Sequence, residues 1–127
     1  MKKYILFILF IGFFASCEEK ASLEEQVMAI HDEAMPRMGE VNAAKKEMRA
    51  LLSQTKDSAT VAEIIDIIDY LDAADEGMYA WMDAYKLPQE EAKKKSYLQR
   101  ELKKVNKVKL DIDESIKQAN EYLKNHK

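Results

Sequence analysis

Glycine and proline are almost absent from the sequence after residue 20, where only Pro36, Gly39, Gly77 and Pro88 occur. The same region is rich in Ala, Glu, Lys, Leu and Met, which favour helices. It contains no pair of alternating apolar segments joined by a hairpin turn. We therefore expect an all-α fold without strands.

Apolar residues recur at steps of three and four along three segments, which predicts three long amphipathic helices. The first begins at Ser22 with a capping box, in which the side chains of Ser22 and Glu25 each satisfy a backbone amide of the first turn. It should run to about Leu52. Pro36 should bend this helix because proline cannot donate the helical hydrogen bond.

The second helix is expected over residues 61–86, capped by Thr60 in a second capping box or, alternatively, by Ser58. Pro88 suits the first position of the third helix, which should extend close to the end of the chain. Short connections between long amphipathic helices favour an antiparallel up-down-up bundle.

The first 16 residues have the layout of a signal peptide, with a basic start followed by an apolar run. That run has 12 residues, from Tyr4 to Ala15, which is too short to span a bilayer. We expect residues 1–16 to be a cleaved signal peptide, 17–21 a tether and 22–127 the helical domain.

The motif Phe14-Ala15-Ser16-Cys17 resembles the lipobox of bacterial lipoproteins, and Cys17 is the only cysteine. The resemblance implies acyl chains on Cys17 that anchor the protein to a membrane. Because Glu18 is not the aspartate that resembles an inner-membrane retention signal, the outer membrane is favoured. The pair Glu18-Glu19 also resembles surface-export signals, which leaves the side of that membrane open.

Charge limits the partners of the mature chain. Removal of residues 1–16 takes away two lysines and leaves 18 basic against 23 acidic side chains, a formal charge of −5. Residues 93–109 hold eight Lys or Arg and one acid, Glu101, whereas residues 61–85 are acidic without a basic residue. We expect these two segments to face each other, and we expect no nucleic-acid partner.

No catalytic pattern stands out: the histidines are His31 and His126, and no glycine-rich loop could hold a phosphate. We expect a non-enzymatic envelope lipoprotein that acts as a helical interaction or scaffold module without a cofactor. The sequence indicates neither the envelope protein it contacts nor its oligomeric state.

One cluster suggests an alternative function. Soft side chains share a face on each of the first two helices, and a hairpin would bring the two faces together. Thioethers and a neutral imidazole prefer Cu(I), and an indole face attracts cations, so a periplasmic copper-binding protein is the alternative. Methionine packing explains the same pattern and is the stronger explanation. The candidate ligands are Met28, His31, Met35, Met78, Trp81 and Met82.

Two charged residues interrupt the apolar stripes. In a hairpin whose helices rise equally, residue numbers across the first two helices sum to about 113. Arg37 then faces Asp75, and we expect a structural ion pair that fixes the register.

Residues 31–39 and 75–82, HDEAMPRMG and DEGMYAWM, resemble segments of small uncharacterised bacterial lipoproteins, some of them named "viral A-type inclusion protein repeat". This resemblance implies helices and a lipid anchor, and it implies no activity.

Overall fold

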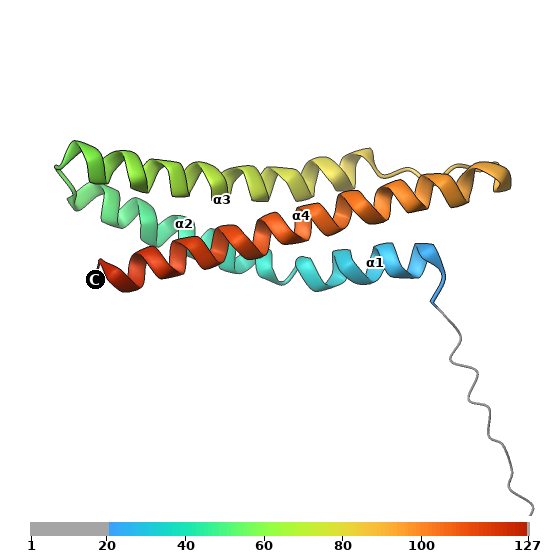
Figure 1. The fold of residues 1–127 in the computed structure, drawn as a ribbon, viewed down its shortest axis with the longest axis horizontal. Helices are drawn as coiled ribbons and strands as arrows, with labels where there is room; N and C mark the ends of the chain where they lie inside the picture. The colour runs from blue at the N-terminus through green and yellow to red at the C-terminus, as the bar shows by residue number, and fades with distance from the viewer. Residues whose placement is uncertain (1–20, 127) are drawn as a thin grey trace, which may run out of the picture.

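The computed structural model describes residues 21–126, and within this range every regular element is a helix. The helices are α1 (Leu23–Ala34), α2 (Arg37–Gln54), α3 (Ser58–Ala84) and α4 (Glu91–Asn125). Because α2 continues the path of α1, the four helices form three antiparallel rods: α1 with α2, α3, and α4 (Figure 1). The expected all-α up-down-up bundle is confirmed, whereas the signal peptide, Cys17 and residues 18–20 of the tether lie outside the described residues.

The start of the first rod agrees with the sequence. The Glu25 amide donates to the Ser22 hydroxyl at 3.2 Å, and the Ser22 amide donates to the Glu25 carboxylate at 3.0 Å, which completes the capping box. Pro36 interrupts the rod between α1 and α2, as expected for a residue without an amide hydrogen. The chain bends there (Figure 1).

Two predicted helix starts are wrong. Asp57 caps α3, because its carboxylate accepts from the backbone amide of Thr60 at 2.9 Å and from the Thr60 hydroxyl at 2.8 Å. Neither Thr60 nor Ser58 is the cap. The last rod begins at Glu91 rather than at Pro88, which lies in the connection after a half-buried Leu87 that packs against the core.

The core runs the length of the bundle, but the rods pack differently at its two ends. In what we call the closed half, residues 37–74 and 109–125, α2, α3 and α4 all contact one another. In the open half, residues 23–34 and 75–108, α1 packs against α4, and no Cα atom of α1 lies within 8 Å of one in α3. The large side chains that are fully buried include Val27, Val41, Met48, Ile64, Leu71, Met78, Val105 and Ile112.

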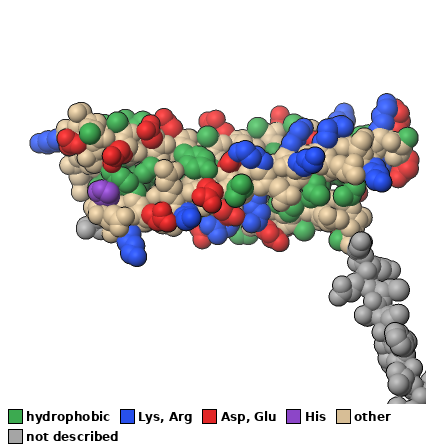
Figure 2. Space-filling model, viewed as in Figure 1, with side chains coloured by type: hydrophobic (Ala, Val, Ile, Leu, Met, Phe, Trp, Pro, Cys, Tyr) green, Lys and Arg blue, Asp and Glu red, His purple; other side chains and the backbone are tan. Residues whose placement is uncertain are grey.

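No helix within residues 21–126 combines the length and the apolar character needed to cross a membrane. Lys and Arg side chains gather over the first half of α4, towards the right of Figure 2, and acidic side chains lie over the first half of α3 at the left.

Candidate functional site

Trp81 lies at the centre of the open half, where α1 and α3 diverge. Its side chain is 7% exposed, and its indole nitrogen donates to a Glu101 oxygen on α4 at 2.9 Å. The other Glu101 oxygen accepts from Lys104 Nζ at 2.9 Å. A carboxylate that is 4% exposed is thereby both hydrogen-bonded and charge-compensated, as a buried charge requires. The pair fixes the indole between α3 and α4.

Sequence reasoning missed Glu101 as a structural residue. A signal was present, because Glu101 is the one acid in the basic stretch 93–109 and lies between Leu98 and Val105 at helical spacing. Charge counting predicted only that this stretch faces the acidic second helix, and the structure turns this one carboxylate into the core.

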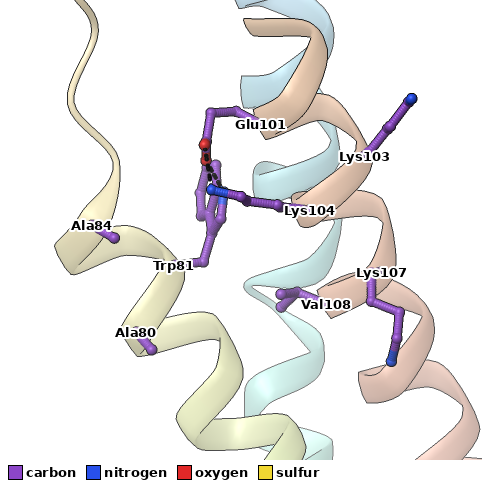
Figure 3. Close-up of a pocket in the computed structure, with 8 residues that line it drawn as sticks. All are labelled: Ala80, Trp81, Ala84, Glu101, Lys103, Lys104, Lys107 and Val108. Atoms are coloured by element: carbon purple, nitrogen blue, oxygen red, sulfur yellow. Dashed lines mark hydrogen bonds and ion pairs between the residues drawn. The ribbon is translucent and has the colours of Figure 1, made fainter. Parts of the chain in front are cut away.

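A groove of about 530 Å³, here called the lysine groove, opens on one side of Trp81 between α3 and α4. Small alanine side chains on α3 leave its floor open, and three lysines of α4 flank it (Figure 3). Lys104 extends across the groove to Glu101, and Lys103 extends outward from α4. Lys107 runs along α4, where its Nζ donates to the Asp111 carboxylate at 2.6 Å. Its lining residues are Ala80, Trp81, Ala84, Glu101, Lys103, Lys104, Lys107 and Val108.

A smaller groove of about 200 Å³, here called the methionine groove, lies between α1 and α3. It is lined by Met28, His31, Trp81, Met82 and Tyr85, and the two methionines are 37% and 40% exposed. The structure therefore brings together four of the six soft side chains singled out from the sequence.

The other two soft side chains do not line the methionine groove. Met78 is fully buried in the core, and the half-buried Met35 packs against the core. Both lie on faces turned to neighbouring helices, where thioethers fill space among aliphatic side chains.

His31 is oriented by its neighbours in the methionine groove. Its Nδ1 lies 3.0 Å from the Asp32 carboxylate, an arrangement that favours a proton on Nδ1 and leaves Nε2 as the acceptor nitrogen. Its ring centre is 5.8 Å from that of Trp81, which lies 5.2 Å from Tyr85. The Tyr85 hydroxyl is buried without a hydrogen-bond partner in residues 21–126, and burial raises its pKa. The groove thus presents soft donors and an aromatic wall.

The predicted ion pair of Arg37 with Asp75 is wrong. Arg37 begins α2 after the break, and its Nε lies 2.9 Å from a Glu40 oxygen and 3.2 Å from an Asp113 oxygen on α4. These contacts are electrostatic and not hydrogen bonds, because the angles at the Arg37 N–H group are unsuitable for hydrogen bonding. The rod turns Arg37 towards α4 instead of α3.

Lys45 takes the place predicted for Arg37. Its Nζ lies 3.0 Å from Asp72 and 3.1 Å from Asp75, and its side chain is 11% exposed. Helical side chains lean towards the start of their own helix, and the start of α2 lies beside the later part of the antiparallel α3. Lys45 therefore reaches Asp72 and Asp75, which follow its direct opposite on α3. Burial lowers the pKa of Lys45, but the hydrogen bonds and charges of Asp72 and Asp75 outweigh this effect and raise it.

Within the described residues, no three His, Cys, Asp or Glu side chains gather as a metal-binding group. No protein-family model matches the chain, and neither a curated protein nor a solved structure does. The candidate site is therefore defined by its own geometry, two grooves that share Trp81 as a common wall.

Proposed function

We propose that this protein is a non-enzymatic, lipid-anchored module of the bacterial cell envelope that docks a partner through a surface groove. The lysine groove, with an apolar floor and a cationic edge, supports this proposal. Such a groove suits a helix whose apolar side chains enter the floor and whose acidic side chains meet the lysines.

The position of α1 fits a membrane anchor on Cys17. Helix α1 begins six residues after Cys17, at the end of the bundle that also holds the connection from α3 to α4. The intervening chain can reach only about 20 Å when fully extended. Acyl chains on Cys17 would therefore hold the open half, with both grooves, close to the membrane.

The charges around Trp81 favour binding over catalysis. Glu101 accepts from both Trp81 and Lys104, so its oxygens are engaged in holding the fold. A general acid or base must exchange protons with a bound substrate, which a carboxylate fixed in this way does not offer. We therefore propose that the protein binds a partner and does not catalyse a reaction.

The anchor is tested by fractionating cells that carry the full chain or its Cys17→Ser variant, with Ala21→Ser as the control. Wild type and control should pellet with membranes and resist salt extraction, and the Cys17→Ser variant should be released. Retention of this variant in the membrane pellet would contradict the lipid anchor, because the described helices include no membrane span.

The docking surface is tested through Trp81, the only tryptophan in the chain. A synthetic acidic peptide with leucines at helical spacing should shift its fluorescence on titration. The Lys103→Ala/Lys107→Ala variant should weaken binding, whereas Lys117→Ala/Lys124→Ala, which removes the same charge elsewhere on α4, should not. Equal binding by both variants would show that the groove does not select the peptide.

A second candidate function is the binding of a soft metal in the methionine groove, favoured by the grouping of Met28, His31 and Met82 beside Trp81. Two thioethers and an imidazole nitrogen suit Cu(I), and the indole face adds a cation-attracting wall. This candidate predicts that Cu(I) quenches Trp81 fluorescence and that Met28→Leu/Met82→Leu abolishes the quenching.

The matched control for the metal test is Met35→Leu/Met78→Leu, which removes the two candidate thioethers that do not line the groove. It should retain wild-type quenching. Absence of tight Cu(I) binding by the wild type in a chelator competition would reject this candidate.

A further inference from the structure

The lysine groove has an acidic counterpart at the other end of the same face. A hollow of about 240 Å³ lies between the first half of α3 and the last part of α4, and we call it the acidic hollow. The Tyr122 hydroxyl donates to the Glu63 carboxylate at 3.3 Å across it. The hollow is lined by Glu63, Asp66, Ile67, Gln118 and Tyr122.

The charge of α4 changes sign between the two hollows. One stripe at steps of four and three is basic up to Lys107 and acidic or neutral from Asp111 onward. The stripe consists of Arg100, Lys104, Lys107, Asp111, Glu114, Gln118 and Glu121.

The facing stripe of α3 changes in step with α4. It carries small residues beside the lysine groove and acidic residues beside the acidic hollow, with Tyr70 between them. The stripe consists of Glu63, Asp66, Tyr70, Ala73, Gly77, Ala80 and Ala84. One continuous face therefore offers a basic half without bulky side chains on α3 and an acidic half.

A two-fold axis across the middle of this face would bring each basic half against the acidic half of a second copy. The axis would lie in the interface, perpendicular to the helices, so that the two copies run antiparallel. Helix α3 has 27 residues and is about 40 Å long, and two neighbouring helices are about 20 Å wide. The product, about 800 Å² for each copy, is the size of a standard specific interface.

From this self-complementarity we infer that two copies of the chain dock through the α3–α4 face in antiparallel orientation. The inference rests on the proposed role of the lysine groove as a docking surface, and it names the occupant as the acidic hollow region of a second copy. One face supplies both partners of the charge complementarity, so a second copy satisfies the basic and the acidic half together.

Charge reversal tests the pairing. Arg100→Glu/Lys103→Glu reverses two charges in the basic half of the face, and Asp66→Lys/Glu114→Lys reverses two charges in the acidic half. These four side chains form no ion pair within residues 21–126, so the changes leave the internal salt bridges in place. Each variant alone should self-associate at least about tenfold more weakly than wild type, and a mixture of the two should recover association.

The measurement is sedimentation of the full chain in a neutral detergent, combined with co-purification of two differently tagged copies. Lys46→Glu/Lys56→Glu reverses two exposed charges away from this face and should behave as wild type. Raised salt should also weaken the dimer, because the Debye length falls from about 10 Å at 0.1 M to about 3 Å at 1 M.

A cross-link tests the orientation independently of charge. Ala73 lies near the middle of the α3 stripe, so Ala73→Cys should form a disulfide with its own counterpart under oxidation. Ala50→Cys, an exposed alanine on α2, is the matched control and should not. The native Cys17 is present in both variants.

The possible results separate the dimer from the docking surface itself. A wild-type chain that stays monomeric, or reversal variants that associate as well as wild type, would overturn the dimer. If the chain is monomeric but Trp81 still responds to the acidic peptide, the proposed docking function stands and only its occupant is wrong.

Discussion

The closed and open halves are built from the same three rods but solve the packing problem with different side chains. In the closed half three helices converge, and aliphatic residues such as Ile64, Leu71 and Ile112 are fully buried. In the open half α1 stands away from α3, and Trp81 with its neighbours fills the space between them. The larger aromatic side chains bridge the gap incompletely and leave grooves on both sides. Stability should therefore depend mainly on the closed half, and binding on the open half.

The largest effect should come from removing a core side chain of the closed half. Leu71→Ala should lower the free energy of unfolding by roughly 2–5 kcal/mol, because it leaves a cavity where three helices meet. Met82→Ala in the open half, at a side chain 40% exposed, should cost less than about 1 kcal/mol. Urea unfolding followed by circular dichroism measures both, and equal losses would remove the distinction between the halves.

A smaller effect is expected at Lys45, the buried cation of the closed half. Lys45→Ala should cost about 1–3 kcal/mol, because it leaves Asp75 largely buried without its partner, while the more exposed Asp72 is screened by solvent. Arg37→Ala is the comparison, and it should cost about 0–1 kcal/mol because the Arg37 side chain is 38% exposed. A larger loss at Arg37 would contradict the observed pairing.

The Lys45 contribution should also depend on pH in a defined direction. The folded pKa is raised above its ordinary value of 10.5, so the stabilisation is complete below 10.5 and is lost as pH rises through the folded value. The difference in unfolding free energy between wild type and Lys45→Met should therefore shrink in alkaline solution. A difference that grows with pH would have the wrong sign for this ion pair.

Within the open half, Glu101→Gln should cost about 0.5–1.5 kcal/mol. The amide oxygen can still accept from Trp81, but the charge that holds Lys104 is lost. Glu91→Gln, at an exposed i,i+3 pair with Lys94, is the control and should change stability less. Thermal melts measure stability, and the Trp81 emission reports whether the indole keeps its hydrogen bond. An unchanged melt for Glu101→Gln would mean that charge at this position contributes nothing.

The smallest effect is expected at the cap of α3, at the closed end of the bundle. The Thr60 amide and, secondarily, the Thr60 hydroxyl donate to Asp57 and lower the pKa of its carboxyl below 3.8. The resulting stabilisation is present above 3.8 and is lost as pH falls through the lowered value. Wild type should therefore exceed Asp57→Asn in stability at neutral pH, and the difference should vanish in acid. Ser58→Ala should have no comparable effect, and a larger loss there would restore Ser58 as the cap.

The sequence predicted the architecture well because apolar spacing depends on helix geometry alone. Val27, Val41, Ile64, Leu71 and Ile112 are apolar residues at the helical spacing that predicts buried positions, and all five are fully buried. The capping box at Ser22 and the bend at Pro36 follow from local hydrogen bonding, and both are confirmed.

Features that depend on the rotation of each rod about its own axis could not be predicted from the sequence. A single hairpin register places His31 close to Trp81, as observed, yet it fails for Arg37, since the break at Pro36 changes which way α2 presents its first turn. The burial of Glu101 likewise depends on the rotation of α4 against α3, which charge counting does not determine. The grouping of Met28, His31, Trp81 and Met82 follows from helical spacing and the hairpin. The packing of Met35 and Met78 agrees with the stronger explanation of the methionines, that they fill the core.

Because of the break at Pro36, partial unfolding of the bundle should affect the two grooves differently. Pro36 donates no amide hydrogen, and the Met38 amide bonds only three residues back, to Met35, at 3.1 Å. Helix α1, with 12 residues, can therefore open as a separate unit while α2, α3 and α4 keep their mutual contacts. Its amides should exchange with deuterium before those of the other helices. Each such opening dismantles the methionine groove, which needs Met28 and His31, and spares the lysine groove, which is built from α3 and α4 alone.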